Sequence, residues 1–161
     1  VGQALLAWRA GELAAAGAET DAIANELARL VPLTLTWAMA RDIRHAVRGG
    51  RIPRWAGPLV RFSGLTPLAA IRQGVLKVAG ALFARRGAPE AFARHVARRV
   101  PEAAGWRLLV GHADATADGE RVLAALRHLL PVTEAHLVEV GPAIGAHAGR
   151  GALVVGLQPA P

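Results

Sequence analysis

The second half of the chain alternates short helical patterns with short apolar runs, and this order restricts the fold more than any other feature. From Ala88 onward the order is helix, strand, helix, strand, loop and strand. The expected elements cover residues 90–100, 106–111, 118–130, 135–140 and 152–157. None of these elements can bury its apolar residues alone, so they predict a sheet that is covered by helices.

The first half adds two helices and a hairpin to this pattern. Residues 4–16 form a helix that is apolar around most of its circumference and ends at Gly17, and a second helix opens at Thr20 and closes at Pro32. Residues 33–37 alternate as a strand, and residues 39–47 return to helical spacing.

The hairpin consists of strands at residues 65–71 and 75–78, joined by a turn at 72–74. It makes the sheet mixed, and Pro67 favours an edge position for its strand. We therefore expect the α/β class, with a single domain over residues 1–161 built as a two-layer sandwich, its mixed sheet covered by helices.

The composition excludes several classes of protein. The chain has no cysteine, so neither a disulfide framework nor a thiolate metal site can form. No apolar run approaches the roughly 20 residues that span a bilayer. Val1 begins directly in a helical pattern without a charged leader. We expect a cytoplasmic protein with no transmembrane segment.

The net charge of +7 comes almost entirely from arginine, since Lys77 is the single lysine. Such a charge attracts phosphates, anionic lipid surfaces and carboxylates. The arginines are scattered, and the densest groups are the pairs Arg85–Arg86 and Arg98–Arg99. A nucleic-acid-binding module would concentrate them on one face beside stacking aromatic residues. That function stays open as an alternative, but we expect no nucleic-acid partner.

Motifs of catalysis and metal binding are absent from the sequence. The six histidines form no HxH or HExxH pattern, and there is no GxSxG, P-loop or GxGxxG after a strand. Asp114 and Thr116 are placed to cap the helix that follows them, and His112 at a strand end indicates a structural role. We expect no catalytic residues, no metal and no cofactor, and therefore no enzyme.

Two cations lie in glycine-rich surroundings. Arg51 follows Gly49 and Gly50, and His147 lies in the segment GAHAGRG among Gly145, Gly149 and Gly151. Glycines permit positive φ and a close backbone approach, so we expect a tight loop that presents His147 ahead of a short buried strand. A plain exposed turn explains the same residues equally simply. An arginine and a histidine suit a carboxylate, and together with a large apolar surface they suit an amphipathic acid.

Three segments of the chain resemble the C-terminal domain of the DegV family of bacterial fatty-acid-binding proteins. They are the opening helix with Gly2, Leu5, Leu6, Ala10 and Gly17, the run RHAVRGGRI ahead of Pro67 and Gly74, and the ending VGPAIGAHAGRGALVVG. The segments occur in the family's order and span nearly the whole chain.

The resemblance implies a two-domain protein that buries a long-chain fatty acid and presents it to a separate fatty acid kinase subunit, which forms the acyl phosphate. It places Arg51 and His147 on the carboxylate side, and Arg85 or Arg86 near that site or on the surface that faces the kinase. Two departures stand out. Arg150 replaces the family's proline between Gly149 and Gly151, and the family's N-terminal domain is absent from this chain. A regulatory or interaction domain without a ligand is therefore a further alternative.

Overall fold

The computed structural model describes residues 1–40, 65–72, 74–83 and 87–160. In this part of the chain a six-stranded sheet has the order β3-β2-β1-β6-β4-β5. The strands are β1 (Leu35–Met39), β2 (Leu65–Arg72), β3 (Val75–Phe83), β4 (Trp106–His112), β5 (Val132–Glu139) and β6 (Leu153–Pro159). Only β4 and β5 pair in parallel, so the predicted mixed sheet is confirmed.

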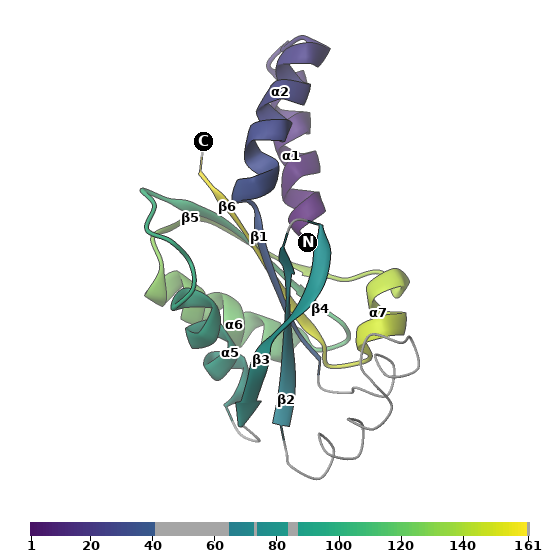
Figure 1. The fold of residues 1–161 in the computed structure, drawn as a ribbon, viewed down its shortest axis with the longest axis vertical. Helices are drawn as coiled ribbons and strands as arrows, with labels where there is room; N and C mark the ends of the chain where they lie inside the picture. The colour runs from purple at the N-terminus through teal and green to yellow at the C-terminus, as the bar shows by residue number, and fades with distance from the viewer. Residues whose placement is uncertain (41–64, 73, 84–86, 161) are drawn as a thin grey trace.

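Helices cover one face of this sheet and part of the other (Figure 1). The helices are α1 (Gly2–Ala15), α2 (Thr20–Leu30), α5 (Ala88–Ala97), α6 (Thr116–Leu129) and α7 (Pro142–Ala148), with a 3-10 turn at Val31–Leu33. Helices α5 and α6 lie side by side on one face, whereas α1 and α2 form a pair that projects away from the sheet. The α/β class and the helix-covered sheet agree with the prediction.

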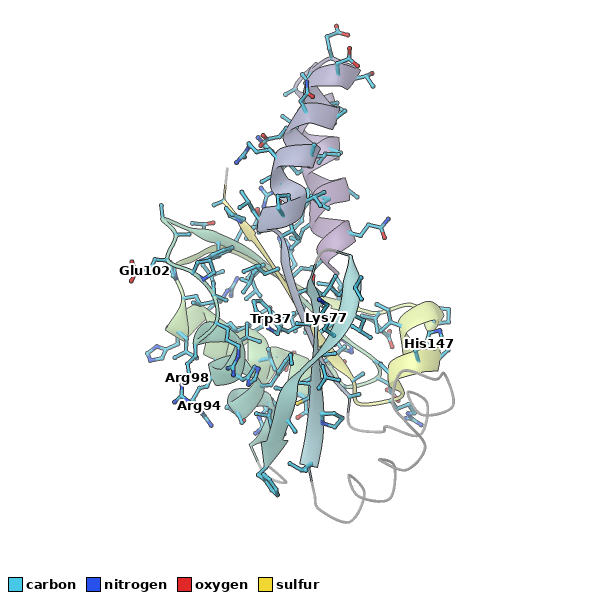
Figure 2. All side chains as sticks on the ribbon, viewed as in Figure 1. Trp37, Lys77, Arg94, Arg98, Glu102 and His147 are labelled. Carbon is cyan, nitrogen blue, oxygen red and sulfur yellow. The ribbon has the colours of Figure 1, made fainter. Side chains whose placement is uncertain are left out.

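The core lies between the sheet and the α5–α6 layer. Alternate residues of β4 point to it, and Trp106, Leu108 and Val110 join Phe92 of α5 and Leu126 of α6 in one buried cluster. Trp37 of β1, labelled in Figure 2, belongs to the same cluster. All seven residues of β4 are buried, because this strand is covered on both faces.

Helix α1 begins directly on the opposite face of β4 and β6. A Cβ atom added to Gly156 would lie 2.8 Å from Cγ1 of Val1 and 3.1 Å from Cδ1 of Leu5. A Cβ atom on Gly111 would lie 2.9 Å from Cγ2 of Val1. Real Cβ atoms essentially never come within 3.0 Å of such atoms, so glycine at these two strand positions lets the first residue of the helix segment, Val1, approach the sheet.

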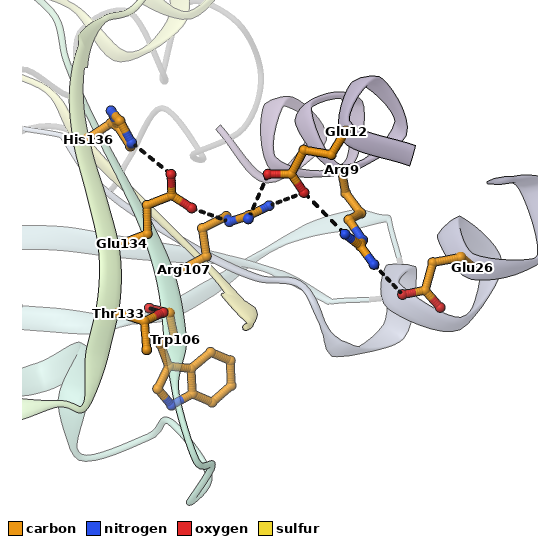
Figure 3. A network of polar contacts seen from close by, with 8 residues as sticks. All are labelled: Arg9, Glu12, Glu26, Trp106, Arg107, Thr133, Glu134 and His136. Atoms are coloured by element: carbon orange, nitrogen blue, oxygen red, sulfur yellow. Dashed lines mark hydrogen bonds and ion pairs between the residues drawn. The ribbon is translucent and has the colours of Figure 1, made fainter. Parts of the chain in front are cut away.

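The projecting helix pair is also held by a buried arginine in β4 (Figure 3). Nη1 and Nη2 of Arg107 donate to the two carboxylate oxygens of Glu12 at 3.1 and 2.8 Å. Nε of Arg107 lies 2.8 Å from Oε2 of Glu134 on β5, and the guanidinium lies over the ring of Trp8. Only 6% of the Arg107 side chain is exposed, so these partners compensate the cost of burying its charge.

The β2–β3 hairpin corrects two predictions. Strand β2 lies between β3 and β1, so the edge position expected from Pro67 is wrong. The Pro67 carbonyl accepts a hydrogen bond from the Ala40 N–H, one residue past the end of β1. Proline is therefore tolerated here, because its missing N–H faces a position beyond the last residue of β1. Strand β3 is the true edge and continues to Phe83, five residues past the predicted end at Val78.

A β-bulge between Leu68 and Ala69 interrupts the pairing of β2 with β3, and Gly80 there has a φ of +123°.

Two other predictions change as well. Met39 closes β1 instead of opening a helix, and the remainder of the helix expected at 39–47 falls outside the described residues, apart from Ala40. No helix in the described ranges is long and apolar enough to cross a membrane.

We expect Glu12→Gln to lower the free energy of unfolding by about 1–3 kcal/mol at pH 7, because it weakens the partner of a buried charge. The hydrogen bond from Arg107 is the main cause that lowers the pKa of Glu12. A lowered folded-state pKa stabilises the protein above the unfolded value of about 4.3, and this contribution is lost as the pH falls through the folded value.

Urea unfolding at pH 7 and pH 3 measures this difference, which should shrink at the lower pH. The matched control is Glu102→Gln, an exposed glutamate outside the helices and strands, which should change the unfolding free energy little at either pH. Equal effects of the two substitutions at pH 7 would contradict the anchoring role of Glu12.

Candidate functional site

The carboxyl ends of three strands meet at one edge of the sheet. Leu153, the first residue of β6, pairs with Met39 at the end of β1 and with His112 at the end of β4. His112 in turn pairs with Glu139 at the end of β5. Since β1 and β4 both run antiparallel to β6, they share a direction with β5. We call this side the carboxyl edge, and in open α/β sheets ligands bind beyond such an edge.

The glycine-rich segment around His147 lies at this edge but is not the predicted loop. Residues Pro142–Ala148 form the short helix α7, and exposed His147 lies in its last turn. Pro142 suits the first position of a helix, and the alanines favour helix, so Gly145 is accommodated inside it. The loop begins only at Gly149, whose N–H donates to the Gly145 carbonyl at 2.8 Å.

The turn after α7 has the backbone geometry that the glycines indicated. Gly149 and Gly151 have φ of +74° and +82°, values that side-chain-bearing residues rarely adopt. The Gly151 N–H donates to the Ala113 carbonyl at 2.7 Å, and the Ala113 N–H donates to the Ala152 carbonyl at 3.0 Å. These two bonds fix the turn to the segment that follows β4.

An ion pair joins the same two segments. The guanidinium of Arg150 contacts the carboxylate of Asp114, which has a φ of +50°. The predicted capping of α6 by Asp114 and Thr116 is therefore wrong, because the residue before this helix is Ala115 and no side-chain cap bond forms. The charge of Arg150 was the one signal in the sequence that could have indicated a partner for Asp114.

His112 has the structural role expected from its place at a strand end. Only 6% of the residue is exposed, and its Nδ1 accepts a hydrogen bond from the Ala115 N–H at 3.3 Å. A Cβ atom on Gly119 of α6 would lie 3.4 Å from its ring, so the histidine packs closely against the helix. His112 is therefore committed to the turn between β4 and α6.

The remaining predicted site residues fall outside the described residues. They are Arg51 with Gly49 and Gly50, and the pair Arg85 and Arg86. Their points of attachment are nevertheless defined. The stretch that carries Arg51 leaves after β1 and returns at Leu65, and the pair follows β3 directly after Phe83. Because Leu65 pairs with Phe83 and both lie on the side where β1 ends, both stretches join the sheet at the carboxyl edge.

An apolar strip lies on the face of β2 and β3 opposite the α5–α6 layer, and no pattern in the sequence indicated it. Register places Ile71 opposite Leu76, and it places Val78 and Phe83 on the same face, opposite Ala69 and Leu65. Phe83 and Val78 are 80% and 79% exposed, and Ile71 and Leu76 are about half exposed. We define the apolar strip as Ile71, Leu76, Val78 and Phe83. It runs from the carboxyl edge along the hairpin.

His95 of α5 is a titratable group on the helix-covered face of the sheet. Burial and the nearby charge of Arg99 lower the pKa of His95, and its Nε2 is buried without a hydrogen-bond partner. A Cβ atom on Gly80 would lie 3.5 Å from its ring, so it fills the contact between α5 and the bulge. Among the described residues there is no group of three side chains that could hold a metal ion.

Comparison with known proteins gives relatives over the full length of the chain. A protein of Deinococcus radiodurans called "DegV domain-containing protein" is 29% identical over 164 residues, covering 99% of this chain and 57% of the relative. The chain therefore spans little more than half the length of that relative.

Solved structures share the fold. A structure titled "Fatty Acid Binding of a DegV family Protein from Thermus thermophilus" is 25% identical, with a TM-score of 0.79 over 99% of this chain and 57% of the other. A DegV family protein from Eubacterium eligens, loaded with heptadecanoic acid, is 12% identical, with a TM-score of 0.83 over 97% of this chain and 56% of the other.

The family comparison covers nearly the whole sequence. The model of the DegV family, which is described as a family of uncharacterised proteins, matches residues 1–160. The fold of the described residues thus resembles that of solved family structures, and this chain is a member of the DegV family.

Proposed function

We propose that this protein binds a long-chain fatty acid, with the carboxylate at the carboxyl edge and the acyl chain along the apolar strip. The observation that carries the proposal is that several chain ends meet at one edge. Helix α7 with His147 lies there, and so do Met39, Leu65 and Phe83, which flank in sequence the stretches that contain Arg51, Arg85 and Arg86. The strip begins at the same edge with Phe83.

The chemistry of these groups suits a carboxylate. A guanidinium offers a planar fork of donors that matches two carboxylate oxygens, and an imidazole adds a third donor. His147 is exposed at the end of α7, so its ring is accessible to a ligand. In Figure 2 His147 lies at the right of the molecule, whereas Arg94 and Arg98 lie at the left, on another part of the surface.

Two family members bind ligands of this class. The protein from Thermus thermophilus binds fatty acid, and the protein from Eubacterium eligens was solved loaded with heptadecanoic acid. Because those proteins are considerably longer than this chain, we propose that an N-terminal domain completes the site. We also propose that the bound acid is presented to a fatty acid kinase, with Arg85 or Arg86 near the site or facing that kinase. The protein itself then acts as a binding protein and not as an enzyme.

We expect Arg51→Ala and His147→Ala each to weaken the binding of oleate and palmitate by about 10- to 100-fold, because each removes a hydrogen bond to a charged group. The full-length protein is purified, its copurifying lipid is identified by mass spectrometry, and dissociation constants are measured after delipidation. Kinase-dependent acyl phosphate formation should fall in parallel.

Arg127→Ala and His128→Ala are the matched controls, since both residues are exposed in the last turn of α6, whose first turn follows the carboxyl edge. They should leave affinity unchanged. Normal affinity in both site variants would refute the site assignment. Absence of copurifying lipid together with no uptake of added acid would refute the function and favour a domain without a ligand.

The apolar strip gives a separate test, which probes the contact with the acyl chain. Val78→Ser should weaken the binding of palmitate about tenfold, because burying a valine side chain contributes about 1.5 kcal/mol or more. Val75→Ser is the control, since Val75 lies on the same strand with its side chain on the other face and is 56% exposed. Equal losses for the two variants would exclude the strip as the acyl-chain surface.

A nucleic-acid-binding module is the second candidate, and one observation favours it. Arg94, Arg98 and Arg99 are exposed together at the end of α5 in a chain of net charge +7. The tryptophans that the structure describes do not support it, because Trp37 and Trp106 are buried and Trp8 packs against Arg107 and His136. No exposed tryptophan in the described ranges is thus available for base stacking.

A gel-shift series separates the two candidates. A nucleic-acid-binding protein that neutralises several phosphates should lose affinity steeply between 50 and 200 mM salt, by about 10³-fold or more for six or more contacts. We expect weak retention of DNA and RNA at 50 mM salt and none at 200 mM, with no change in Arg94→Ala. Tight binding that persists at 200 mM and is lost in Arg94→Ala would favour the nucleic-acid-binding function instead.

A further inference from the structure

Two turns at the carboxyl edge are held together by both backbone and side chains. In the turn of Gly149–Arg150–Gly151, the Gly151 N–H donates a hydrogen bond to the Ala113 carbonyl. The Ala113 N–H donates in turn to the carbonyl of Ala152, the residue after the turn. The next residue, Asp114, forms the ion pair with Arg150. The turn follows α7 directly, so its position sets where the last turn of that helix lies, and with it His147.

We propose that Arg150 and Asp114 act as positioning residues that hold His147 for its anionic ligand, and that they make ligand binding sensitive to salt. The inference rests on the proposed function, because it assigns a role to residues beside that site. A proline between the two glycines, as the sequence resemblance implies for other members of the family, would stiffen the turn by fixing φ. Arginine has no such restriction, so the ion pair replaces covalent stiffness with an electrostatic contact.

The backbone at Asp114 suits this role. Asp114 is the only residue other than glycine with a positive φ in the described part of the chain. Aspartate and asparagine tolerate this conformation better than most residues, because their short side chains bond locally. The hydrogen bonds at Ala113 fix the residue immediately before it, so the Asp114 carboxylate starts from a defined backbone position.

The exposure of the pair determines its strength. The side chains of Arg150 and Asp114 are 87% and 57% exposed, so water and salt screen their attraction strongly. Exposed pairs of this kind change an equilibrium by about two- to fivefold. The pair therefore adjusts the turn that the backbone bonds already define, and its effect should disappear in concentrated salt.

The test compares Asp114→Asn, Arg150→Gln and the double variant in the full-length protein, with oleate as the probe, at about 20 mM and 500 mM salt. Asparagine keeps the size and the backbone tolerance of aspartate and removes only its charge. At low salt each single variant should bind oleate about two- to fivefold more weakly, and the double variant should be no worse than either. At high salt all should match the parent. Arg150→Lys should retain affinity, because it keeps the charge.

Exchange of the Gly151 amide provides a readout that needs no lipid. Exchange of this amide should be faster in Asp114→Asn at low salt. Adding Arg150→Pro to Asp114→Asn should restore both the protection of the amide and the affinity for oleate. Faster exchange without a change in affinity overturns the positioning role. A loss of affinity in Arg150→Gln but not in Asp114→Asn overturns it as well, since Arg150 then acts without its partner. If His147→Ala binds oleate normally, His147 is not part of the site, and the positioning role fails while fatty acid binding stands. If the parent protein itself takes up no oleate, the proposed function fails.

Discussion

The sheet is continuous only because its last strand in sequence lies at its centre. Strand β6 pairs antiparallel with β1 on one side and with β4 on the other. Without it, the hairpin and β1 would form one small sheet, and β4 with β5 another. The core residues Leu153, Val155 and Leu157 are contributed by this strand. The two halves of the chain therefore fold onto each other through a strand that is more than 100 residues from β1 in sequence, so this pairing is long-range.

The same strand determines the site. Its first residue, Leu153, is in register with the ends of β1 and β4, so the turn before it and helix α7 are brought to the carboxyl edge. The interiors of β4 and β6 are buried and largely apolar, and the one arginine among them, Arg107, is paired with Glu12 and Glu134. The charged side chains at the carboxyl edge, Asp114 and Arg150, therefore come from segments beyond the strand ends. A polar head at the edge and an apolar strip on one face of the hairpin together match an amphipathic acid better than a wholly polar ligand.

The elements with strong periodicity could be predicted from the sequence, and those that depend on tertiary contacts could not. The run at residues 106–111 gave β4 to within one residue, because a strand covered on both faces is apolar throughout. The glycines around His147 were misread as a loop, since helix or turn there depends on Pro142 and on the contact of Gly151 with Ala113. Asp114 was misassigned as a cap because its partner, Arg150, is distant in sequence. The roles of Arg51, Arg85 and Arg86 stay predictions, and so does the role of His147, although its position is defined.

The bulge at Gly80 has a consequence for the behaviour of the protein in concentrated solution. Strand β3 is a long, apolar edge strand, and such a strand offers unpaired backbone N–H and C=O groups to an edge strand of another molecule. The bulge breaks the regular spacing of those groups partway along the strand, and Lys77 adds a charge close to it. A second molecule can therefore align with only part of this edge strand, so the fold can expose an apolar strip while it resists growth into a larger sheet.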